Sequence, residues 1–190
     1  MGKISSYSPT SVAKRSDTIL GVNNQGSTPV TTKFTEDNLI TRATGGIGFF
    51  GNAAAEGGAT GTTPTVVTKF TTVLEEKTFA STAANLYIEI PTGESGTYRL
   101  EAELDVMNDT NAAIFCIRLT KNGVNISGTL RQSTAQAANR PVGLSTTWEA
   151  AYVQGDRIRL ECYKAAPAPT TGIDTYINGR LRAIKIRSNA

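Results

Sequence analysis

The chain of 190 residues contains no histidine. Histidine is the side chain whose charge changes between about pH 5 and 8, and it is the usual general base and a common metal ligand. Its absence excludes Ser-His-Asp and Cys-His catalysis and every histidine-based metal site. We therefore expect a protein that is not an enzyme and that needs no cofactor.

Cysteine is also scarce, because only Cys116 and Cys162 are present. Both lie inside apolar, strand-like runs, and their spacing is not that of a metal site. Two small buried apolar side chains are the favoured interpretation. A disulfide between neighbouring strands stays open as the alternative.

Long apolar runs and blocks of like charge are missing as well. No stretch approaches the ~20 apolar residues that cross a bilayer, and the N-terminus has no apolar core of a secretory signal. The 19 Lys and Arg against 16 Asp and Glu give a net charge of +3. This balance predicts neither nucleic acid nor membrane as a partner.

From residue 65 onward the sequence predicts eight or nine strands and no helix. The clearest segment is GTYRLEAELDVM, Gly96–Met107, in which apolar and charged residues alternate with a period of two. Asn122-Gly123 predicts a hairpin turn, Gln154–Asp156 a second turn, and Asn178-Gly179 the start of the last strand. The pattern indicates an antiparallel sandwich. The predicted core residues are Leu100, Leu104, Phe115, Ile117, Ile158 and Leu160.

Gly46, Gly48 and Gly51 spell the G-x-G-x-x-G pattern of a dinucleotide-binding loop. That loop requires a strand before it and a helix that begins within it. The following residues carry further glycines and Pro64, which oppose a helix. We therefore interpret residues 45–64 as a glycine-rich joint whose backbone is free to bend.

Glu101, Glu103 and Asp105 project from one face of the predicted strand Gly96–Met107. Carboxylates at i and i+2 lie ~7 Å apart, a separation that suits glycoside hydrolysis. A solvated strand face predicts the same pattern, and we favour it. Arg157 and Arg159 are candidates to offset these acids from a neighbouring strand or subunit.

Residues 1–44 are polar, rich in Ser and Thr, and interrupted by prolines. Residues 35–40 are compatible with one helical turn. The segment has too little apolar surface for its own core, so we expect an extended arm that attaches to other subunits. The predicted anchors of this arm are Ile19, Leu20, Val22, Phe34, Leu39 and Ile40. Residues 65–190 are then the head domain.

The block from Gly96 to Ile186 resembles the trimeric jelly roll of the complement globular-head and tumour-necrosis-factor type. The matching segments are GTYRLEAELDV, IRLTKNGVNI, AAYVQGDRIRLECY and INGRLRAIKI, in chain order. The Gly-Asp turn followed by alternating apolar residues is the most specific of these features. The resemblance implies an antiparallel jelly-roll sandwich that assembles as a homotrimer.

The N-terminal KISSYSPTSVAKRSDTILGVNNQGSTPVTTKFTEDNLI is similar to the leading segment of many bacteriophage fibre proteins. The similarity implies a structural virion protein that is assembled in the host cytoplasm and docks by its arm on a major capsid or tail protein. Capsid decoration or a short head fibre is the favoured role, since the chain has no long shaft. A tail fibre or a receptor-binding tip that contacts host-surface glycans is the alternative. Candidates for such contact flank or begin a predicted exposed loop, and they are Tyr163, Lys164 and Tyr176.

Overall fold

The computed structural model describes residues 18–23, 30–35, 43–50, 61–77, 85–166 and 172–188. The chain divides into two compact units, Met1–Thr41 and Arg42–Ala190.

The first unit contains a two-stranded antiparallel hairpin. Strand β1 (Thr18–Asn23) pairs with β2 (Val30–Thr35), and Ile19 lies opposite Phe34. The predicted helical turn over residues 35–40 lies outside the described residues apart from Thr35, which is the last residue of β2.

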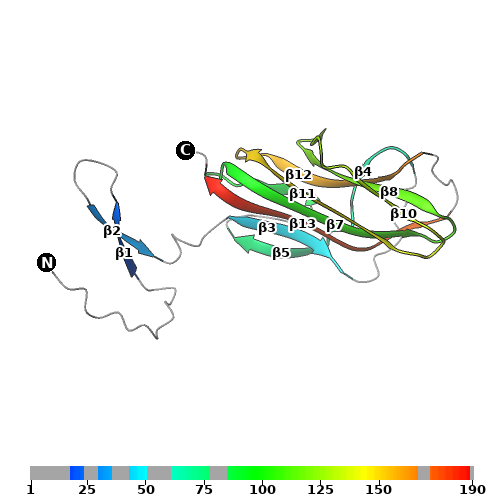
Figure 1. Cartoon of the computed structure of the whole chain (residues 1–190), viewed down its shortest axis with the longest axis horizontal. Coiled ribbons are helices and arrows are strands. Elements are labelled where there is room, and N and C mark those ends of the chain that lie inside the picture. Colours follow the sequence, from blue (N-terminus) through cyan, green and yellow to red (C-terminus); the bar gives the residue numbers. More distant parts are fainter. Residues whose placement is uncertain are drawn as a thin grey trace, which may run out of the picture. The chain divides into compact units, whose positions relative to one another are not determined.

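The second unit is a sandwich of two antiparallel sheets (Figure 1). The five-stranded sheet has the order β11 (Val142–Tyr152), β7 (Gly96–Asn108), β13 (Asp174–Ser188), β3 (Thr44–Phe49) and β5 (Thr72–Lys77). The six-stranded sheet has the path β10 (Arg131–Ala135), β8 (Ala113–Lys121), β12 (Arg157–Lys164) and β4 (Thr65–Val66), with β6 (Ile88–Glu89) on β12 and β9 (Val124–Asn125) on β8. The described residues contain no α-helix. The predicted all-β antiparallel jelly-roll sandwich is confirmed.

The core lies between the two sheets and follows the alternation of the sequence. Strand β7 buries every second residue, so its acidic and basic side chains face outward. All six predicted core residues are buried, and none of them is more than 1% exposed. Tyr98 and Tyr152 add an edge-to-face contact with ring centroids 6.2 Å apart.

Both predicted turns are confirmed. Asn122-Gly123 joins β8 to β9, and both residues have the positive φ that this hairpin turn requires. Gly155, also with positive φ, makes the turn that precedes β12. The predicted start of the last strand at Asn178-Gly179 is wrong, because β13 begins at Asp174 and continues through both residues, with a bulge between Tyr176 and Asn178. A bulge uses an extra residue without reversing the chain.

The glycine-rich joint predicted over residues 45–64 is wrong for its first residues. Gly45 to Phe49 lie in β3, which pairs with β13 on one side and β5 on the other. Ile47 and Phe49 are buried in the core. The sandwich therefore begins before residue 65, and residues 51–60 lie outside the described residues.

Gly48 is required here by close packing. A Cβ atom on it would lie 2.7 Å from Leu74 Cδ1 and 2.9 Å from the carbonyl oxygen of Gly179. The side chain of Leu74 has some freedom to move, whereas the carbonyl of a central strand has none. Gly46 and Gly48 thus belong to a strand with a crowded outer face, and the dinucleotide interpretation is excluded because they do not lie in a loop.

Candidate functional site

The outward face of the five-stranded sheet carries the acidic row that the sequence singled out. Glu103 forms an ion pair with Arg180 at 2.7 Å, and Glu101 forms one with Arg182 at 3.2 Å. The strand register places each arginine directly opposite its partner. Arg99 contacts Glu101 at 3.0 Å from the same strand. The face therefore presents interleaved charges of both signs.

The cations that offset this row come from β13. The expectation that Arg157 and Arg159 supply them within the chain is wrong, because both lie on β12 in the other sheet. Arg180 and Arg182 do so instead. Their spacing in GRLRAIK was a usable signal, since a period of two puts both on one face of the last strand.

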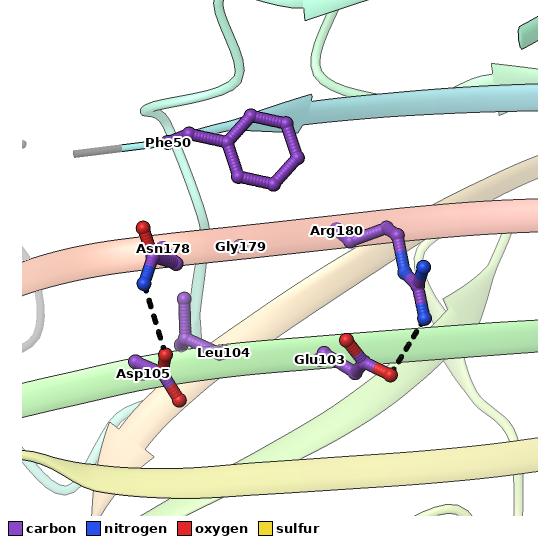
Figure 2. Close-up of a pocket in the computed structure, with 7 residues that line it drawn as sticks. All are labelled: Phe50, Glu103, Leu104, Asp105, Asn178, Gly179 and Arg180. Carbon is purple, nitrogen blue, oxygen red and sulfur yellow. Dashed lines mark hydrogen bonds and ion pairs between the residues drawn. The ribbon is translucent and has the colours of Figure 1, made fainter. Parts of the chain in front are cut away.

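Beside this row the surface is hollowed, with a volume of about 100 Å³. Figure 2 shows Phe50 over the end of the hollow, with Asn178 and Asp105 below it. Asn178 donates a hydrogen bond to Asp105 at 3.1 Å. Phe50 directly follows the last residue of β3, and it is 69% exposed. Phe50 could not be recognised from the sequence. It stands beside Ile47 and Phe49 in one apolar segment, and nothing in that segment indicates that its side chain is exposed.

This geometry does not suit carbohydrate hydrolysis. A glycosidase places its two carboxyl groups on either side of the bond to be cleaved, whereas Glu101 and Glu103 each contact an arginine. The hollow is also smaller than the ~300 Å³ at which small-molecule sites usually begin. What the face offers is one exposed aromatic ring beside a self-balanced set of charges.

A second polar cluster is fully buried between the sheets. Lys164 Nζ lies 2.9 Å from Asp174 Oδ2 and 3.2 Å from Asp174 Oδ1, and both side chains are 0% exposed. Asn108 donates from Nδ2 to Asp174 Oδ1 at 2.9 Å. These groups belong to three strands, so the cluster ties the two sheets together at one end of the sandwich.

The residues predicted for contact with a receptor are placed differently from one another. Tyr163 is half-buried on the outward face of β12, where Arg118 lies 5.9 Å from its ring centroid. Lys164 and Tyr176 are fully buried, so their predicted exposure is wrong. The alternation of RIRLECYK already placed Lys164 on the inward face with Leu160. Residues 167–171 of the predicted loop lie outside the described residues.

Both cysteines are buried free thiols. Cys162 pairs in register with Ile117, and Cys116 with Tyr163, so the two residues occupy adjacent strands. Burial raises the pKa of the Cys162 thiol to about 12. Burial likewise raises the pKa of the Cys116 thiol. The interpretation as small apolar side chains is confirmed.

The predicted arm anchors are only partly described. Ile19, Leu20 and Val22 lie in β1 and Phe34 lies in β2. Leu39 and Ile40 lie outside the described residues. Their role in attachment stays a prediction.

The described residues contain neither a candidate metal site nor a candidate membrane-spanning helix. They contain no group of three or more Cys, Asp or Glu side chains placed to hold a metal ion. In the same part of the chain, no helix is long and apolar enough to cross a membrane.

Comparison with known proteins identifies the fold. No family model matches the chain, and no curated protein matches it. Among solved structures, the tumour necrosis factor Eiger of S. frugiperda matches with a TM-score of 0.50 and 9% identity, over 78% of this chain and 96% of that one. The globular domain of the zebrafish complement 1qA protein has a TM-score of 0.49 and 11% identity, over 77% and 99% of the two chains. The chain therefore has a jelly-roll fold similar to that of the Eiger structure.

Proposed function

We propose that the protein is a structural virion protein of a bacteriophage, a homotrimeric capsid decoration or head-fibre protein. Its N-terminal arm anchors it and its jelly-roll head projects. The observation that carries the assembly part is the outward face of the five-stranded sheet, with paired charges of both signs next to the exposed ring of Phe50.

Such a face suits a second copy of the same chain. A surface that interleaves acids and arginines can lie next to copies of itself without net repulsion, whereas a face of one sign would repel its copy. Aromatic and arginine side chains are also the types enriched at the energetic centres of interfaces. In a trimer with a threefold axis, each of the three subunits would contribute this face to the contact with its neighbours.

The arm supports the attachment part of the proposal. Residues 1–41 form a compact unit separate from the sandwich, and they contain the segment that is similar to the leading part of phage fibre proteins. Three arms on one trimer would bind a particle far more tightly than one arm, since each bound arm raises the effective concentration of the others. The proposed docking partner is a major capsid or tail protein.

The oligomeric state tests the assembly part. Sedimentation equilibrium should give three times the chain mass of 20.1 kDa. Phe50→Ser should weaken association, because it removes a ring that is 69% exposed in the isolated subunit. Val124→Ser is the matched control, since Val124 is 70% exposed but lies on the hairpin strand β9 of the other sheet. A stable monomer of the wild type at micromolar concentration would refute the trimer.

Truncation tests the attachment part. The cut belongs after residue 41, because the carbonyl of Ala43 accepts a hydrogen bond from the Lys185 backbone at 2.8 Å and β3 begins at Thr44. Removal of residues 1–41 should leave a folded, trimeric head that no longer joins particles. Gold labelling of intact particles would then distinguish capsid from tail. Wild-type occupancy by the truncated protein would mean that the head itself docks.

A further inference from the structure

Two arginines surround one tyrosine on the outward face of the six-stranded sheet. The guanidinium carbon of Arg157 lies 4.9 Å from the ring centroid of Tyr87, and that of Arg159 lies 5.3 Å from it. Arg157 and Arg159 are two residues apart on β12, so they share one face. Arg157 pairs with Glu89 in the strand register, and Tyr87 precedes that strand on the same side. The ring thus fixes both guanidinium groups through cation–π contacts.

The charges of this cluster are not balanced. Arg157 forms an ion pair with Glu89 at 2.8 Å. Arg159 has no carboxylate partner among the described residues. Two nearby acids already have cationic partners of their own. The first is Asp156, which forms an ion pair with Lys121 at 2.7 Å.

The second of these acids is Glu161, which follows Arg159 on the same face of β12. Arg118 holds it at 2.8 Å. One guanidinium charge therefore remains available to an anion from outside the chain.

The surface beside Arg159 is hollowed on the same side. One depression of about 430 Å³ is lined by Arg157, Arg159, Asn122, Gly123 and Gly155. A second, of about 520 Å³, adjoins it at Gly155, and its polar lining residues are Asn85, Tyr87, Glu89, Thr92 and Gln154, of which Glu89 is paired with Arg157. Both volumes lie in the range of small-molecule sites. A Cβ on Gly123 or Gly155 would meet no atom within 4 Å, so the space above both turns is open.

We propose that this cluster, defined by Tyr87, Arg157 and Arg159, binds the carboxylate or sulfate group of an acidic saccharide. A planar guanidinium matches two oxygens of such a group at once. The adjoining depression supplies amide and hydroxyl groups that suit the hydroxyls of a sugar ring. A nucleic acid fits less well, because the face carries one surplus cation and no basic stripe. The site faces away from the five-stranded sheet, so the proposed trimer leaves it accessible.

Calorimetric titration of the full-length protein tests the proposal. The probes are a sulfated glucuronic-acid tetrasaccharide, its desulfated counterpart, a neutral glucose tetrasaccharide and sodium sulfate. We expect the first two to bind, the third not to bind, and sulfate alone to bind more weakly than the acidic sugars. Binding of the acidic probes should fall as salt is raised, because the contact is electrostatic.

Two variants assign the binding to this cluster. Arg159→Gln should lower the binding affinity for the acidic probes at least tenfold. Arg140→Gln removes the same charge from an exposed position on a distant turn and should change nothing. Tyr87→Phe should keep the affinity, since the ring remains, whereas Tyr87→Ala should lower it.

Four results would overturn the inference. Equal affinities of the Arg159 and Arg140 variants would place the anion elsewhere. Equal binding of the neutral sugar would remove the role of charge, and binding of sulfate as tight as that of the sugars would leave only an inorganic anion site. No binding of either acidic tetrasaccharide at millimolar concentration would end the proposal. None of these results bears on whether the protein is a trimer, so the two proposals fail separately.

Discussion

Replacement of Lys164 by Met should destabilise the sandwich strongly. The substitution keeps most of the side-chain volume but removes the cation that lies 2.9 Å from Asp174 Oδ2. Asp174 would then be a carboxylate with 0% exposure and one remaining donor, Asn108 Nδ2 at 2.9 Å. The penalty comes from a buried charge without its counterion.

The magnitude follows from the geometry of the pair. Loss of one partner of a buried ion pair costs ~3–5 kcal/mol in proteins generally. The hydrogen bond from Asn108 remains and offsets ~1 kcal/mol, so we expect a loss of ~3 kcal/mol for Lys164→Met. The double change Lys164→Met and Asp174→Leu removes both charges. It should cost less than the single change, because apolar replacements of a buried pair are often neutral or stabilising.

Equilibrium urea unfolding of the wild type, the two single variants Lys164→Met and Asp174→Leu, and the double variant measures these values. Two protein concentrations separate dissociation of subunits from unfolding. Arg157→Gln is the comparison for an exposed pair, since its side chain is 52% exposed and that of Glu89 is 40% exposed. It should cost at most ~1 kcal/mol. A loss below ~1 kcal/mol for Lys164→Met, or a double variant as unstable as the sum of the singles, would refute the reasoning.

Three further predictions concern the sandwich. Leu160→Ala should cost ~2–5 kcal/mol in urea unfolding, because the side chain is fully buried in the core. Gly48→Ala should cost ~1–3 kcal/mol through overpacking, while Gly61→Ala, whose Cβ would meet its nearest atom at 3.7 Å, should be nearly neutral. Burial of Asp156 opposes ionisation, but hydrogen bonds from Lys121, the Val153 backbone and Asn122 lower its pKa below the ordinary 3.8. The folded state therefore gains stability from this carboxylate above that value and loses it as pH falls through the lower folded pKa. The stability advantage of the wild type over Asp156→Asn should accordingly shrink between about pH 5 and pH 2.

The strands with alternating patterns could be predicted from the sequence because burial there is decided locally. In β7 and β12 the period of two already separates Leu100 and Leu160 from the charged positions. The same rule placed Lys164 inward, but its polar character suggested a loop. Only the structure supplies the reason that this lysine is tolerated there, namely Asp174 on a strand ten residues later in the chain.

The strand β3 could not be predicted in this way. Gly46 and Gly48 carry no side chain that would reveal a period, and the glycines alone indicated freedom of the backbone. At Gly48 the cause is crowding by Leu74 and by the carbonyl oxygen of Gly179, and at Gly46 the nearest atom is Cγ of Arg182; all of these residues lie far away in the sequence. The start of the last strand was predicted too late for a related reason, since pairing with β7 keeps the chain extended from Asp174 through Asn178 and Gly179.

The two outward faces of the sandwich differ in how they treat charge, and this difference links the two proposals. On the five-stranded sheet, Glu101 and Glu103 each have an arginine opposite them, so acids and arginines are interleaved and copies of the face can meet without opposing blocks of like charge. On the six-stranded sheet, Arg159 has no carboxylate partner within the described part of the chain, and a copy of that face would oppose cation to cation. Self-association is therefore favoured on the face of the five-stranded sheet and disfavoured on that of the six-stranded sheet. Binding of an external anion is favoured only on the face of the six-stranded sheet. A charge reversal such as Glu103→Arg should thus weaken the trimer and leave saccharide binding unchanged, whereas Arg159→Gln should have the opposite pair of effects. If both variants altered both properties, the two faces would not act independently and the assignment of separate roles would be wrong.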